Sequence, residues 1–131
     1  MIEPMVFAQA VVSAFIAILF LQSGLDKVMD FGGNLAWLEG HFAKSPLRGQ
    51  VKPMLSVVTV LEIVAGALCA AGAVQVVLAG STQLAGWGAQ AASATITMLF
   101  FGQRVAKDYV GAAVLVPYFI LCVGAVLLMA R

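Results

Sequence analysis

The chain has 131 residues, of which 63% are hydrophobic and 10% are charged, and its formal net charge is +1. Its mean hydropathy of +1.05 excludes an ordinary soluble domain, because such domains are roughly 45–50% apolar and about 25% charged. The near-neutral charge, with a few cations spread along two loops without aromatic interleaving, gives no indication of nucleic-acid binding.

Apolar runs of membrane-spanning length dominate the chain, since a helix needs about 20 residues to cross a bilayer. We expect helices at residues 5–25, 54–78, 84–103 and 110–129. The predicted fold is all-α, an integral membrane four-helix bundle in a single domain over residues 1–131. The leader Met1-Ile2-Glu3-Pro4 is acidic and no small-residue cleavage site follows the first run, so we interpret that run as a helix and not as a signal peptide.

The segment between the first two runs is rich in charge, and residues 26–53 therefore lie outside the hydrocarbon core. Within it, Gly32-Gly33 is expected to break the preceding helix and Asn34 to cap a new one. Apolar residues then recur at helical spacing. This pattern predicts a short amphipathic helix on the membrane surface between helices 1 and 2, with Trp37 at headgroup level and His41 in solvent.

The distribution of cations predicts the orientation of the chain. With four spans, one side of the membrane carries six of the seven Lys and Arg residues: Lys27, Lys44, Arg48, Lys52, Arg104 and Lys107. Only Arg131 falls on the other side. By the positive-inside rule, both charged loops are cytoplasmic and both termini lie outside.

Polar residues mark one face on three of the expected helices, because steps of three and four residues return to the same side of a helix. The face of the first helix, which we expect to point inward, contains Gln9, Ser13, Ile16, Phe20, Ser23 and Lys27. The second helix has a face of small residues around Glu62, which predicts close packing: Thr59, Gly66, Cys69 and Ala73. The third carries a polar stripe that must face protein or water: Gln83, Gly86, Gln90, Ser93, Thr97, Arg104 and Asp108.

Glu62 is the one charged residue inside the second span, ~12 Å along its axis from the start. Because an isolated carboxylate in hydrocarbon costs several kcal/mol, Glu62 is expected to be either paired or protonated. Arg104 is the preferred partner, since a guanidinium binds a carboxylate bidentately, and Lys27 is the second choice. The predicted polar cluster comprises Ser23, Lys27, Glu62, Arg104, Lys107 and Asp108, with Gln90 and Thr97 deeper.

This cluster has two interpretations. It is either a buried salt bridge that fixes helix packing, or a ligand or proton site. Cys69 and Cys122 are isolated and are expected to be inert apolar residues. A single His41, without a cluster of His, Cys, Asp or Glu at ligand spacing, predicts no metal and no intrinsic cofactor. Any redox cofactor would then belong to a partner.

Three motifs and one loop resemble the DoxX family of small bacterial membrane proteins. They are Leu21-Gln22-Ser23-Gly24-Leu25-Asp26-Lys27, Leu61-Glu62-Ile63-Val64-Ala65-Gly66, Arg104-Val105-Ala106-Lys107-Asp108-Tyr109 and Trp37-Leu38-Glu39-Gly40-His41-Phe42. The resemblance implies a four-helix bundle in the bacterial inner membrane. It also implies a link to redox enzymes, since some members are subunits of thiosulfate:quinone oxidoreductase. It supplies no catalytic motif that can be carried over.

The leading hypothesis is an accessory subunit of a redox or quinone-linked complex that is not catalytic on its own. A quinone headgroup needs hydrogen-bond donors at the edge of an apolar bundle, which Ser23, Lys27 and Arg104 would provide. The alternatives are a structural anchor that docks a larger complex, and a small permease in which Glu62 carries protons. The expected partners are the lipid bilayer and either other membrane subunits or further copies of the chain.

Overall fold

The computed structural model describes residues 3–130, and within them the chain forms five helices. These are α1 (Pro4–Met29), α2 (Phe31–His41), α3 (Val51–Ala79), α4 (Gln83–Val105) and α5 (Tyr109–Met129). The expected all-α class is confirmed. Among the described residues, α1, α3 and α5 are long and apolar enough to cross a membrane, which fits a multi-pass membrane protein. The leader residues Met1 and Ile2 and the orienting residue Arg131 lie outside the described range.

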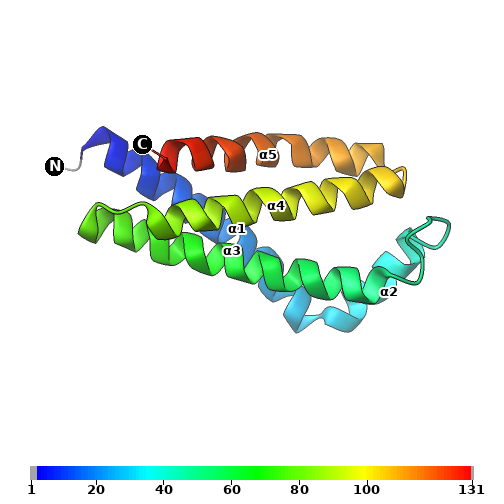
Figure 1. Ribbon diagram of the computed structural model, residues 1–131. Helices are drawn as coiled ribbons and strands as arrows, with labels where there is room; N and C mark the ends of the chain where they lie inside the picture. The colour runs from blue at the N-terminus through cyan, green and yellow to red at the C-terminus, as the bar shows by residue number, and fades with distance from the viewer. Residues whose placement is uncertain (1–2, 131) are drawn as a thin grey trace.

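The long helices pack in a simple order, α1 against α3, α3 against α4, and α4 against α5 (Figure 1). The start of α1, the end of α5 and the link between α3 and α4 lie at one end of the molecule. At the opposite end lie α2, the loop that follows it and the link between α4 and α5 (Figure 1). The cation-rich segments on either side of α2 and at the end of α4 are therefore at the same end.

The break after α1 falls at a different residue from the one expected. Helix α1 continues one turn past the predicted end to Met29, and the backbone leaves helical geometry at Asp30 (φ −132°, ψ 51°). Because Asp30 makes the break, α2 starts directly after it and contains Gly32-Gly33. Asn34 is consequently inside α2, where its side-chain amide donates to the Asp30 carbonyl at 2.9 Å. The predicted capping role of Asn34 is wrong.

The inward face predicted for α1 is confirmed from Gln9 to Phe20. Gln9, Ser13, Ile16 and Phe20 are all buried, and Ile16 and Phe20 belong to the main apolar core. The Ser13 hydroxyl donates to the carbonyl of Cys69 on α3 at 2.6 Å. A side-chain bond of this kind joins two helices without exposing a polar group to lipid.

Glycines allow α3 to approach its neighbours closely, as its small-residue face predicted. A methyl group at Gly66 would lie 2.7 Å from Leu21 Cγ of α1. A methyl group at Gly72 would overlap the backbone N and Cα of Ala85 on α4. Side chains cannot be accommodated at these contacts, so the helix backbones themselves set the spacing.

Helix α4 packs through small residues and not through its polar stripe. Its buried residues are Ala85, Gly88, Ala89, Ala92, Thr95 and Ile96. The residues of the stripe that recur every seven positions, Gln83, Gln90, Thr97 and Arg104, are exposed. The close approach of α4 to α3 needs the small face, and the polar stripe is therefore rotated to the outer surface.

One side chain from α1 and one from the link between α3 and α4 hold the end of α5. The Gln9 amide donates to the Leu128 carbonyl at 3.1 Å, and the Thr82 hydroxyl donates to the Met129 carbonyl at 2.7 Å. The last carbonyls of a helix have no partner within that helix, so these bonds satisfy groups that would otherwise be unpaired.

Candidate functional site

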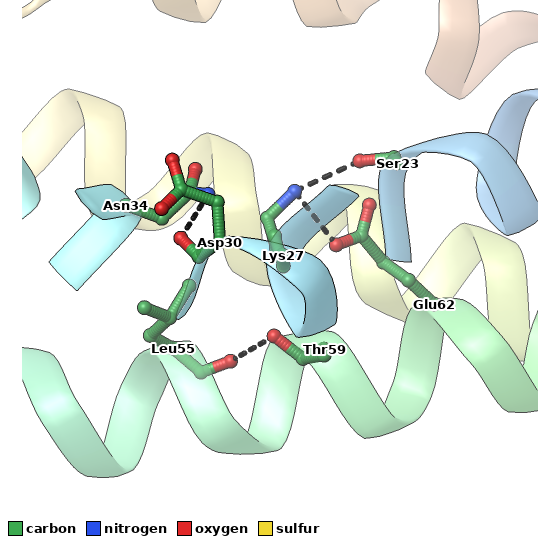
Figure 2. Close-up of polar contacts among 7 residues, drawn as sticks. All are labelled: Ser23, Lys27, Asp30, Asn34, Leu55, Thr59 and Glu62. Atoms are coloured by element: carbon green, nitrogen blue, oxygen red, sulfur yellow. Dashed lines mark hydrogen bonds and ion pairs between the residues drawn. The ribbon is translucent and has the colours of Figure 1, made fainter. Parts of the chain in front are cut away.

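The site centres on an ion pair between α1 and α3. Lys27 Nζ lies 3.0 Å from Glu62 Oε1, and it also donates to Ser23 Oγ at 2.8 Å (Figure 2). Glu62 is only 2% exposed, whereas the Lys27 side chain is 19% exposed. The carboxylate is therefore sealed in the protein, and the ammonium lies between it and the edge of the structure.

A glycine on α1 makes this pairing possible. Ser23 and Lys27 are one helical turn apart, and Gly24 lies on the same side of α1 facing α3. A methyl group at Gly24 would lie 2.7 Å from Ile63 Cγ1 and 3.5 Å from Glu62 Cβ. Without a side chain at this position, α1 comes close enough to α3 for Lys27 to reach the carboxylate.

The contact between Lys27 and Glu62 is an ionic attraction rather than an aligned hydrogen bond. Glu62 Oε1 is within ion-pair distance of the ammonium, but within the described range it has no hydrogen-bond partner of acceptable geometry. The nearby Thr59 hydroxyl donates to the Leu55 carbonyl at 2.7 Å and not to the carboxylate (Figure 2). The stability of the charged Glu62 therefore depends on one cation.

The predicted partnership of Glu62 with Arg104 is wrong. Arg104 is exposed, and its guanidinium carbon lies 4.5 Å from the centre of the Tyr109 ring, a cation–π contact. Lys27, the second choice, is the partner. The reason is the rotation of α4, which presents its small face to α3 and turns Arg104 away from Glu62.

The remaining members of the predicted cluster are also elsewhere. Gln90 and Thr97 are on the exposed face of α4. Lys107 is exposed in the link to α5, and Asp108 caps α5 by accepting a bond from the Gly111 backbone N–H at 2.9 Å. Of the eight residues predicted, the structure brings together Ser23, Lys27 and Glu62.

A cavity of about 600 Å³ lies beside this pair, a volume typical of small-molecule sites. Its walls come from the end of α1, α2, the loop after it, the first half of α3 and the last half of α4, and they are mostly apolar. The polar side chains among its lining residues are Lys27, Asn34, Trp37, Thr97 and Gln103. The polar pattern of the sequence predicted Lys27 and Thr97 as site residues, but no pattern in the sequence indicates the cavity itself.

A second polar contact joins α2 to the end of α4. His41 Nε2 lies 3.2 Å from Gln103 Oε1 and 3.5 Å from Asp108 Oδ2. The His41 ring stacks on Trp37, with ring centres 4.8 Å apart. The prediction that His41 is solvated is wrong, since its side chain is 20% exposed. No local pattern signals a contact between residues 62 positions apart.

Within residues 3–130, no group of three or more His, Cys, Asp or Glu side chains lies close enough together to hold a metal ion. Both cysteines are buried and unpaired. The chain was compared with protein-family models, curated proteins and solved structures, and none of them matches it.

Proposed function

We propose that the chain is a DoxX-like accessory subunit of a redox complex in the bacterial inner membrane. In this proposal it spans the membrane four times and holds a neutral, lipid-soluble molecule of the quinone class. The observation that carries the proposal is the largely apolar cavity with an ion-paired lysine in its wall. The subunit binds and orients the molecule, and a partner subunit supplies the electrons.

The placement of α4 as a fourth span is supported by its length and its neighbours. Its 23 residues extend ~34 Å, enough to cross the hydrocarbon core. It packs between α3 and α5, two helices that are themselves apolar enough to span. In this arrangement α2 lies at the membrane surface, with Trp37, 64% exposed, at headgroup level.

The charge balance of the cavity favours a neutral ligand. Lys27 is the charged residue among the lining side chains, and the carboxylate of Glu62 offsets its charge at 3.0 Å. An anionic headgroup would need an uncompensated cation. Quinone carbonyls instead need hydrogen-bond donors, which a lysine, an indole N–H and an amide supply, while the apolar wall accommodates a ring and its tail.

A permease is less well supported. Its proton path would have to run along the polar stripe of α4, and the residues of that stripe are exposed on the outer surface rather than arranged around a channel. A purely structural anchor would need no cavity, and the binding experiment below separates it from the proposed function.

The two tryptophans allow ligand binding to be measured at the cavity. Trp37 lines the cavity, whereas Trp87 does not. In a Trp87→Phe variant, a short-chain benzoquinone should quench the Trp37 fluorescence saturably. Adding Lys27→Met with Glu62→Leu should weaken binding about tenfold or more, since a hydrogen bond to a charged group contributes ~1.5–3 kcal/mol.

The matched control is Trp37→Phe, in which Trp87 remains and should show only linear, collisional quenching. Non-saturable quenching of Trp37 would count against the cavity as a quinone site and favour the anchor. Unchanged affinity in the Lys27→Met/Glu62→Leu variant would show that the ligand does not use Lys27.

The orientation can be tested separately by cysteine labelling. In a Cys69→Ala/Cys122→Ala background, a cysteine appended after Arg131 should react with a membrane-impermeant maleimide added to intact cells. A cysteine replacing Lys44 should not react, because its loop carries the cations retained in the cytoplasm. The opposite labelling pattern would reverse the orientation and leave the arrangement of helices unaffected.

A further inference from the structure

Helix α4 carries an exposed seam along its full length. Its residues follow one another at alternating spacings of four and three, and every one of them is exposed: Gln83, Trp87, Gln90, Ala94, Thr97, Phe101 and Arg104. We call this set the α4 seam. The apolar members are well exposed, with Trp87 at 50% and Phe101 at 62%. Alternating four and three is the spacing of the residues that meet a partner helix in a coiled coil.

The polar groups of the α4 seam are not all satisfied within the chain. The hydroxyl of Thr97 donates to the Ser93 carbonyl at 2.9 Å, which is the usual way for a threonine to be accommodated in a membrane helix. Gln90 has no corresponding bond to the backbone of its own helix, and within residues 3–130 its side-chain amide makes no hydrogen bond. Seven residues into α4, it would face hydrocarbon ~10 Å from the helix start.

We propose that the α4 seam is a homodimer interface, on which a second copy of this chain packs its own α4. The inference rests on the proposed spanning position of α4, because only hydrocarbon makes an unpaired Gln90 costly. Two copies inserted in the same orientation bring their α4 helices together in parallel about a two-fold axis along the membrane normal. Identical seam residues then meet at equal depth.

The seam is chemically suited to meeting itself. A glutamine amide is both a donor and an acceptor, so Gln90 of one copy can bond to Gln90 of the other. The small Ala94 meets its own copy at a level between Trp87 and Phe101, which lets the two helices approach closely there. Arg104 lies at the aqueous end, where salt screens the repulsion between two copies. An unrelated partner would not require this self-complementarity.

Dimerisation would also complete the cavity. Thr97 and Phe101 belong both to the α4 seam and to the cavity lining. A second copy on the seam therefore places protein beside the part of the cavity wall that α4 provides.

Disulfide cross-linking in native membranes tests the interface. In the Cys69→Ala/Cys122→Ala background, Gln90→Cys and Ala94→Cys should each give a dimer on oxidation. Ile120→Cys is the matched control, since Ile120 is 66% exposed on α5 at a similar distance from the same end. It should remain monomeric. A companion Gln90→Leu variant should raise the dimer dissociation constant in detergent at least tenfold.

Equal cross-linking of Gln90→Cys and Ile120→Cys, or no cross-linking at either seam position, would overturn the homodimer. A cross-linked product of a size other than two chains would assign the seam to a different partner and would also overturn it. Reaction of Gln90→Cys with an impermeant maleimide would instead show that α4 lies in water, which would refute the four-span proposal itself.

Discussion

Replacing Lys27 with Met should destabilise the folded protein by ~3–5 kcal/mol, the range for breaking a buried ion pair by removing one partner. The substitution leaves the Glu62 carboxylate, which is 2% exposed, without its cation. No second donor within the described residues reaches Glu62 Oε1. The loss of stability is measured by unfolding the protein in mild detergent with heat or with increasing SDS.

The two single substitutions should differ in size. Glu62→Leu strands the ammonium of Lys27, but the Lys27 side chain is 19% exposed and can extend toward water, so the loss should be smaller. The double variant Lys27→Met/Glu62→Leu should be close to wild type in stability, because no charge is left unpaired. A double-mutant cycle of these variants gives the coupling energy directly.

Arg104→Met is the control that separates the observed pair from the one the sequence suggested. Because Arg104 is exposed and contacts Tyr109, its replacement should change the stability by less than ~1 kcal/mol. Additive losses from Lys27→Met and Glu62→Leu would mean that the two side chains do not interact.

Gly72→Ala should be the most damaging substitution of a glycine by alanine in the chain. The added methyl would overlap the backbone of Ala85, and a backbone cannot move aside as a side chain does. Helices α3 and α4 would have to separate along their contact. Overpacking of this kind costs ~1–3 kcal/mol and sometimes more.

Gly124→Ala is the matched control, since Gly124 is also within a long helix but a methyl there meets nothing within 4 Å. It should leave stability unchanged or raise it by up to ~1 kcal/mol through better helix propensity. Thermal unfolding of both variants in the same detergent provides the comparison. Equal stabilities would show that α3 and α4 do not approach as closely as described.

Features that follow from local periodicity could be predicted from the sequence. The buried face of α1 follows from residues at helical spacing such as Gln9, Ser13 and Phe20. The tight face of α3 follows from Gly66 and its small neighbours. The spacing of residue types within one helix indicates which face is buried, so these faces can be predicted without knowing the rest of the fold.

The partner of Glu62 could not be predicted in the same way, because it depends on the rotation of α4 about its own axis. Two patterns on α4 compete for the interior, the polar stripe and the small face. Close contacts at Gly88, where a methyl would lie 2.6 Å from Cys69 Sγ, decide in favour of the small face. Such contacts require both helices, and no single segment of sequence specifies them.

The contact of His41 with Gln103 was missed for a related reason. It depends on the direction in which α2 leaves α1, and that direction is set by the backbone at Asp30. The glycines after Asp30 looked like the stronger helix breaker, yet they are accommodated inside α2. Both glycines are exposed, and α2 runs through them despite their low helix propensity.

The bond from Gln9 to Leu128 has a consequence for how the chain is made. The two residues are 119 positions apart, so the bond forms only after the ribosome has finished α5. Until then the Gln9 amide, buried in the completed protein, lacks this acceptor, and Thr82 likewise waits for Met129. The Ser13 bond to α3 forms much earlier. The first helix to be synthesised is thus among the last to complete its hydrogen bonds. A chain that stops before α5 leaves the polar groups of Gln9 and Thr82 without these acceptors, and an incomplete product differs from a finished one in this respect.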